Sequence, residues 1–284
     1  MITELKDDFD YEFLDSQFTE EEIKKNFRSL NKNFSTLTKK WDISLNTEWI
    51  LRNYLAIKMI LSSSVLISSA EFAKTKNLKI VEPYLIYYSL FNCSRAVLLT
   101  SPIKEWENGK LFELSHKATI EDIAKIVIGY NKEKGEALEK YINWMKEYRE
   151  LFSYKFPARG LTNSFTSLQE CVKTCKLLCE IAQFQSKVLE NSITKHVKDE
   201  LDLDWNALSD GFTYGEINFQ FIDQNDASRL GYAQRKQKRP YSIFSTMTEG
   251  MVEDFFGAWC PDDQTKTEDL YNPDTNWLII FPVP

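Results

Sequence analysis

Arg95 and His116 are the residues of the central region whose types could do chemistry. The chain has only two histidines, and a histidine titrates near neutral pH, so His116 could act as a general base or acid. An arginine keeps its proton and can hold phosphate charge. Acting together on RNA, His116 would exchange a proton with the ribose 2′-hydroxyl while Arg95 stabilised the phosphate.

The residues around Arg95 predict that it lies on an aromatic face of a helix. Tyr88, Phe91, Asn92 and Leu99 stand at helical spacings from it, which places all five on one side. A guanidinium there needs acceptors, so Arg95 either forms a structural ion pair with a carboxylate or faces a groove. His116, close to a predicted helix start, either caps and packs or takes part in chemistry. The sequence leaves both alternatives open for each residue.

A basic run near the C-terminus is a second candidate site. Its members are Arg229, Tyr232, Arg235, Lys236, Lys238 and Arg239. Cations beside tyrosines can bind phosphates and stack on bases, which indicates a nucleic-acid interface, and a solvated basic loop is the alternative. The acidic segment that follows Glu249 could also fold back on this run and make an intramolecular contact.

The cysteines and the common nucleotide motifs predict no metal and no cofactor. Cys171, Cys175 and Cys179 recur every four residues and would line one side of a helix. Burial as small apolar side chains is the expected role, and metal ligation is the alternative. No GxxxxGK[ST], GxGxxG, GxSxG or HExxH motif occurs, so the enzyme classes that carry them are not supported.

Composition favours an intracellular, mainly α-helical protein. Five cysteines without a CxxC pair fit a reducing compartment, and the acidic N-terminus lacks a secretion pattern. The apolar stretches 59–70 and 84–100 fall short of a membrane span. The net charge of −7 argues against general coating of polyanions. We therefore expect a cytoplasmic protein that does not enter a membrane.

About six helices must position the candidate residues. Apolar residues at helical spacing predict helices over 19–40, 46–76, 83–100, 119–130, 136–153 and 167–196. Thr119 is the predicted cap of the fourth helix, and Gly135 is predicted to separate the fourth from the fifth. Each amphipathic face must be buried against another, so the sequence predicts a helical bundle.

The last third of the chain differs in character. Glycine and proline are frequent after residue 201, and the runs 216–222 and 277–281 predict two strands. We therefore divide the chain into an N-terminal helical segment (1–45), a helical bundle (46–200) and a small mixed α/β or irregular C-terminal appendage (201–284), which contains the basic loop and the acidic tail.

Three local patterns between about residues 80 and 155 resemble HEPN domains. The pattern Tyr-Tyr-x-x-Phe-x-x-x-Arg-Ala of the HEPN core helix is matched by Tyr87, Tyr88, Phe91, Arg95 and Ala96. The string Leu114-Ser115-His116-Lys117 is similar to the opening of the next helix, and Arg149 to Tyr154 is similar to an Arg-x-x-x-x-Tyr pattern in a later one.

The resemblance implies a HEPN-like helical bundle that dimerises and binds or cleaves RNA. Many HEPN domains are metal-independent ribonucleases of toxin–antitoxin, CRISPR and phage-defence systems. Their catalytic members carry a histidine four to six residues after the arginine, whereas position 101 here is Ser and the next histidine is His116. The alternative is a non-catalytic module that dimerises or binds a partner protein, as other members of the family do.

Overall fold

The computed structural model describes residues 9–106, 111, 114–157, 168–206, 211–214, 217–220, 222–236, 238–257 and 277–282. Within these residues the chain is mainly helical, as the sequence predicts. The helices in chain order are α2 (Glu12–Gln17), α3 (Glu20–Thr38), α4 (Ile43–Thr75), α5 (Glu82–Leu99), α6 (His116–Ile128), α7 (Lys132–Tyr154), α8 (Leu168–His196), α10 (Gln224–Lys236), α11 (Ile243–Thr246) and α12 (Glu249–Gly257).

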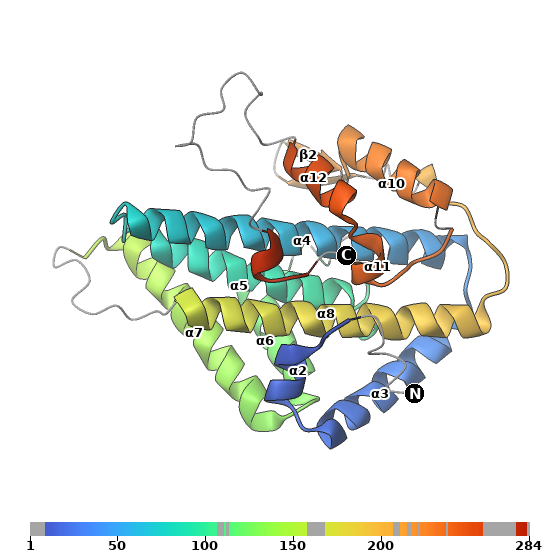
Figure 1. Cartoon of the computed structure of the whole chain (residues 1–284), viewed down its shortest axis with the longest axis horizontal. Coiled ribbons are helices and arrows are strands. Elements are labelled where there is room, and N and C mark those ends of the chain that lie inside the picture. Colours follow the sequence, from blue (N-terminus) through green and yellow to red (C-terminus); the bar gives the residue numbers. More distant parts are fainter. Residues whose placement is uncertain are drawn as a thin grey trace.

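The long helices α4, α5 and α8 pack side by side and form the centre of the molecule (Figure 1). Their facing residues, such as Ile57, Leu90 and Phe184, are completely buried. Helices α3, α6 and α7 lie on one side of this centre, and α10 and α12 lie along α4 on the other side (Figure 1). The candidate residues of α5 therefore lie on the opposite side of α4 from those of α10.

Side-chain caps explain where several helices begin. Thr19 and Glu22 form a capping box at the start of α3, in which the side chain of each accepts a hydrogen bond from the backbone N–H of the other. The Asp42 carboxylate accepts a hydrogen bond from the N–H of Leu45 at the start of α4, at 2.8 Å. These starts lie close to the predicted ones.

The start of α6 differs from the prediction. The helix begins at His116, because the Ser115 hydroxyl accepts a hydrogen bond from the N–H of Ala118, at 3.2 Å. The predicted cap, Thr119, is a buried residue within the helix. The correction matters for the site, since it places His116 in the first helical position.

Gly135 lies inside α7 and does not separate two helices. The helix starts at Lys132, and a Cβ atom on Gly135 would lie 2.4 Å from Cγ1 of Ile128. Glycine is therefore required because the first turn of α7 packs directly against the end of α6.

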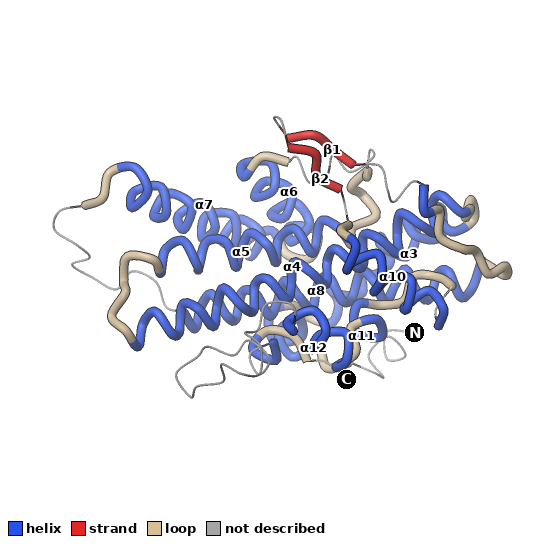
Figure 2. The backbone as a smooth tube through the Cα atoms, turned by 90° about the horizontal axis from the view of Figure 1, so that it is seen from above, coloured by secondary structure: helices blue, strands red, loops and turns tan. Residues whose placement is uncertain are grey.

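The C-terminal third contains short helices and one small hairpin. The strands β1 (Gly211–Tyr214) and β2 (Ile217–Gln220) pair antiparallel, with Phe212 opposite Phe219 (Figure 2). The predicted strand at 277–281 is wrong, because Trp277–Ile279 is a 3₁₀ turn. Ile280 and Phe281 are adjacent in sequence and are both buried in the core. The segment therefore lacks the alternation of buried and exposed residues that a strand would show. The predicted basic loop is also corrected, since Arg235 and Lys236 form the last turn of α10.

Buried polar side chains of the central helices hold the C-terminal region. The amide of Asn53 on α4 donates to the carbonyl oxygen of Tyr241 at 2.7 Å, and Gln183 on α8 accepts from the N–H of Phe244 at 2.8 Å. Ile243 and Met247, from the same segment, are completely buried in the common core. The start of α11 is thus hydrogen-bonded to two of the central helices.

By length and composition, α4 could cross a membrane, and no other helix of the described residues meets that test. The apolar stretch 59–70 is part of this continuous helix of 33 residues. In the most apolar window of α4, 56% of the residues are buried inside the protein, and the core helices of globular proteins pass the same test.

Arg52 on α4 fixes the C-terminal end of α5. Its side chain is 1% exposed and donates hydrogen bonds to the carbonyl oxygens of Leu98 (3.3 Å), Leu99 (2.6 Å) and Ser101 (2.8 Å). Glu48 balances the charge, at 2.9 Å from Arg52. The last carbonyl groups of a helix have no partner within it, so Arg52 replaces the water that an exposed helix end would bind.

We predict that Arg52→Ala lowers the free energy of unfolding by about 3–5 kcal/mol, because Glu48 and the end of α5 lose their partner in the interior. Urea denaturation followed by circular dichroism measures the effect. The matched control is Arg28→Ala on the exposed side of α3, which should change stability by no more than about 0.5 kcal/mol. An Arg52 variant as stable as the control would contradict this role.

Glu180 on α8 caps the N-terminus of α2 from inside the protein. Its carboxylate accepts hydrogen bonds from the N–H groups of Phe13, at 3.1 Å, and Leu14, at 2.6 Å. Burial raises the pKa of Glu180 to about 7, although these two hydrogen bonds act in the opposite direction. The carboxyl group is thus harder to ionise in the folded protein than in the unfolded chain.

We predict that Glu180→Gln removes a pH dependence of stability. A pKa raised on folding favours the folded state most below the unfolded pKa, and that contribution is lost as pH rises through the folded pKa. The wild type should lose up to roughly 3 kcal/mol of stability between about pH 4.5 and pH 7 relative to the Glu180→Gln variant. Denaturation at several pH values tests this, with Glu147→Gln, an exposed residue of α7, as the control. Parallel stability curves for the wild type and the Glu180→Gln variant would refute it.

Candidate functional site

Helices α5, α6 and α7 bring the three HEPN-like patterns together. Tyr87 and Phe91 stand one turn apart on α5 and are buried, while Tyr88 and Arg95 on the same helix are partly exposed. His116 stands at the first position of α6, held there by the Ser115 cap. Arg149, near the end of α7, completes the group. We call Tyr87, Tyr88, Phe91, Arg95, His116, Lys146 and Arg149 the central cluster.

Aromatic rings of α5 fix the position of His116. Its imidazole stacks on Phe91, with ring centroids 4.4 Å apart and planes 13° apart. The Tyr87 hydroxyl forms a hydrogen bond with Nδ1 of His116. The other ring nitrogen, Nε2, is therefore the one left to act on a ligand.

Arg95 and His116 both lie against Phe91, so the structure brings together two residues that are far apart in sequence. The guanidinium carbon of Arg95 lies 4.6 Å from the ring centroid of Phe91. Burial lowers the pKa of Arg95, and the nearby Tyr87 acts in the opposite direction. Even so, a guanidinium remains charged at any physiological pH.

Arg149 contacts both tyrosines of the pattern. Its guanidinium carbon lies 5.1 Å from the Tyr87 ring centroid and 5.7 Å from that of Tyr88. One terminal nitrogen donates to the Tyr88 hydroxyl at 3.3 Å, and the other lies 3.2 Å from the Glu150 carboxylate. The buried Nε has no hydrogen-bond partner among the described residues. Arg149 is therefore positioned by both tyrosines and by Glu150.

The cluster disfavours the protonated form of His116. Burial lowers the pKa of His116, and the positive charges of Arg149, Arg95 and Lys146 lower it further, while Glu150 acts in the opposite direction. A neutral imidazole can accept a proton, and the surrounding cations can bind an anion. The arrangement can therefore hold a phosphate group beside the imidazole of His116, which can act as a general base.

The chain's resemblance to HEPN domains indicated Arg149 only as part of a pattern, and it did not indicate Lys146 or the Tyr87 hydroxyl as parts of a site. Spacing along one helix cannot show these contacts, because three different helices supply them. The short pattern Arg149 to Tyr154 was the one signal that pointed to α7.

The basic run is not part of the central cluster. It lies beyond α4, on the side away from α6 and α7 (Figures 1 and 2). Arg229 pairs with Asp254 at 2.5 Å, and Lys238 pairs with Asp202 at 2.7 Å. The acidic segment does contact this run, as the sequence suggested for one alternative. The described residues include no carboxylate paired with the other three cations, which are Arg235, Lys236 and Arg239.

The predicted cysteine row is buried in the core. Cys171, Cys175 and Cys179 line the side of α8 that faces α5, where the sulfur of Cys179 lies 3.8 Å from that of Cys93. Within the described ranges there is no group of His, Cys, Asp or Glu residues arranged to hold a metal ion. Packing accounts for these side chains.

Comparison with protein-family models, curated proteins and solved structures finds no match to this chain.

We predict that Arg149→Gln raises the pKa of His116, because one of the positive charges that disfavour the imidazolium is removed. A titration of the histidine ring protons by NMR measures it. Lys140→Gln, an exposed residue of the same helix, is the charge-matched control and should leave the pKa unchanged. An unchanged His116 pKa in the Arg149 variant would show that the two side chains do not interact in solution.

Proposed function

We propose that this chain is a HEPN-like protein that binds RNA at the central cluster and cleaves it without a metal ion. The observation that carries the proposal is the convergence of Arg95, His116 and Arg149 around Phe91 and the two tyrosines. The order and types of these residues match the HEPN patterns, and their chemistry suits a phosphodiester.

The proposed reaction uses the 2′-hydroxyl of RNA as the nucleophile. Nε2 of His116 takes the proton of that hydroxyl, and its oxygen attacks the adjacent phosphorus. The bond from phosphorus to the 5′-oxygen breaks, and this oxygen takes a proton from water. The hydroxide that is left takes the proton of the His116 imidazolium, which regenerates the base. Arg95 and Arg149 stabilise the negative charge that develops on the phosphoryl oxygens. The products are a 2′,3′-cyclic phosphate and a 5′-hydroxyl.

Ser101 stands where catalytic HEPN domains carry their histidine. It is 1% exposed, and its carbonyl oxygen is bound by Arg52, so its side chain cannot take that role. In the proposed site His116 supplies the imidazole from the first turn of the next helix instead. Phe91 makes this substitution possible, because it contacts both the imidazole and Arg95.

A dimer or a complex with a partner protein is the second candidate, and one end of the molecule favours it. The connection between α4 and α5 lies at the same end of the molecule as the end of α7 (Figures 1 and 2). Both segments carry exposed apolar side chains. The most exposed are Tyr154, at 80%, and Phe156, at 64%. In this alternative the chain is a non-catalytic module, and the central cluster only stabilises the fold.

We predict that the purified wild type cleaves a mixed RNA pool in the presence of EDTA. Arg95→Ala, His116→Ala and Arg149→Ala should each reduce the rate by about 10²-fold or more, because each removes a base or a phosphate ligand. The readout is gel electrophoresis of the cleaved RNA. The 2′,3′-cyclic phosphate is detected because it blocks labelling of the 3′-end. If cleavage is found, we expect the protein to act in bacterial defence or in a toxin–antitoxin system.

His196→Ala is the matched control, since it removes the other histidine and should leave cleavage intact. Circular dichroism must show that every variant is folded. A folded wild type that binds RNA but leaves it uncut would refute the nuclease proposal. A folded wild type that neither binds nor cuts RNA, yet dimerises in light-scattering measurements, would support the interaction module.

A further inference from the structure

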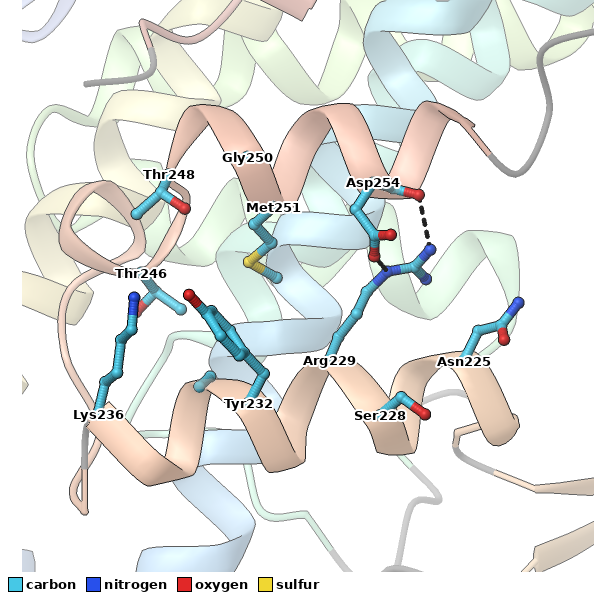
Figure 3. A pocket seen from close by; sticks show the side chains of 11 residues that line it. Asn225, Ser228, Arg229, Tyr232, Lys236, Thr246, Thr248, Gly250, Met251 and Asp254 are labelled. Carbon is cyan, nitrogen blue, oxygen red and sulfur yellow. Dashed lines mark hydrogen bonds and ion pairs between the residues drawn. The ribbon is translucent and has the colours of Figure 1, made fainter.

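A groove between α10 and α12 lies outside the central cluster and is not used by the proposed reaction. Its volume is about 690 Å³, which is within the size range of small-molecule sites. One wall is the face of α10 that carries Arg229, Tyr232 and Lys236, and the other is formed by Thr248, Met251 and Asp254 (Figure 3). From Asn225 at one end to Lys236 at the other, the α10 wall is about 16 Å long by the rise of a helix.

An ion pair closes the groove toward one end. Nε of Arg229 lies 2.5 Å from the Asp254 carboxylate, and a terminal nitrogen donates to the Asp254 carbonyl oxygen at 2.8 Å (Figure 3). This pairing joins α10 to α12 and neutralises Arg229. The groove therefore does not depend on Arg229 for anion binding, although the sequence grouped it with the other basic residues.

The opposite end of the groove carries a cation, Lys236. Lys236 is exposed and lies 4.6 Å from the ring centroid of Tyr232, and the described residues place no acidic group in an ion pair with it. An interaction with Lys236 lowers the pKa of Tyr232. Because an ammonium can only donate, the phenol keeps its own O–H for another acceptor. Both groups thus present donors at the same end of the groove.

The beginning of α12 faces this cationic end. Thr248 precedes the helix, and its carbonyl oxygen accepts the first helical hydrogen bond, from the N–H of Val252 at 3.1 Å. A Cβ atom on Gly250 would meet nothing within 4 Å, so the backbone of the first turn borders open space. The N–H of Met251 also donates to the Thr248 carbonyl oxygen, at 3.0 Å, so Glu249 and Gly250 carry the first-turn N–H groups that can favour an anion.

Between the two ends the groove is apolar. The side chain of Met251 points from α12 toward the ring of Tyr232 on α10 (Figure 3). A ring and a thioether form a surface suited to a planar, aromatic ligand group. Beyond them, Asn225 and Ser228 offer hydrogen-bonding groups.

We propose that this groove binds a mononucleotide, with its phosphate at Lys236, the Tyr232 hydroxyl and the start of α12, and its base beside Met251. The cationic end and the apolar surface of Met251 and Tyr232 are neighbouring parts of the groove, which suits a phosphate and an aromatic base joined by a sugar. The site is distinct from the central cluster and does not depend on whether that cluster cleaves RNA.

Isothermal titration of the full chain with AMP tests the proposal. We expect saturable binding of one AMP per chain, at least tenfold weaker in Lys236→Met and in Tyr232→Ala. Lys32→Met removes an equal charge from an exposed position of α3 and should leave the affinity unchanged. Adenosine and inorganic phosphate should each bind at least tenfold more weakly than AMP, since each engages only part of the groove.

Three outcomes would overturn the proposal. They are no heat of binding from AMP, an equal loss of affinity in the Lys32 and Lys236 variants, and phosphate that binds as tightly as AMP. The titration is repeated with His116→Ala, which should bind AMP like the wild type. If AMP binding is lost in His116→Ala and kept in Lys236→Met, the nucleotide binds at the central cluster and the groove does not form this site.

Discussion

The structure depends on the buried contact between Arg52 and the end of α5. Helix α5 runs between α4 and α8, so its C-terminal carbonyl groups end in the interior, where water cannot bind them. Arg52 supplies the donors, and the Trp49 ring, 4.1 Å from its guanidinium carbon, covers it. Because the helix is fixed at this end, the positions of Phe91 and Arg95 along the core are fixed as well. Every contact in the central cluster rests on that placement.

The sequence predicted the long helices well and their detailed junctions poorly. Apolar spacing is a property of one helix, so α3, α4, α5 and α8 were found close to their observed bounds. The junction of α6 and α7 depends on packing between two helices, which spacing does not report. Spacing therefore predicts a break at Gly135, which is instead a point of contact with Ile128. The C-terminal helices are short, and α10 has few buried apolar residues, so little periodicity marked them.

The candidate site was predictable by residue type and not by arrangement. Arg95 and His116 were selected because their chemistry is rare in the central region, and the shared contact with Phe91 brings them together. Arg149 lies on α7 and joins the central cluster through folding, because it contacts Tyr87 and Tyr88 on α5. For the basic run, the sequence showed the charges but not their partners. Asp254 and Asp202 neutralise two of those cations, which leaves Lys236 at the groove.

The electrostatics of the central cluster agree with the anion binding that we propose. Three cations act on one partly buried imidazole, and the Glu150 carboxylate, which pairs with Arg149 and Lys146, acts in the opposite direction. Like charges held close together cost free energy in the folded state, and a bound phosphate would reverse that cost. The same charges lower the pKa of His116, and a general base must be unprotonated to accept a proton. Anion binding and proton transfer therefore require the same arrangement of side chains. Proton transfer also requires that Nε2 of His116 reaches a 2′-hydroxyl once RNA is bound.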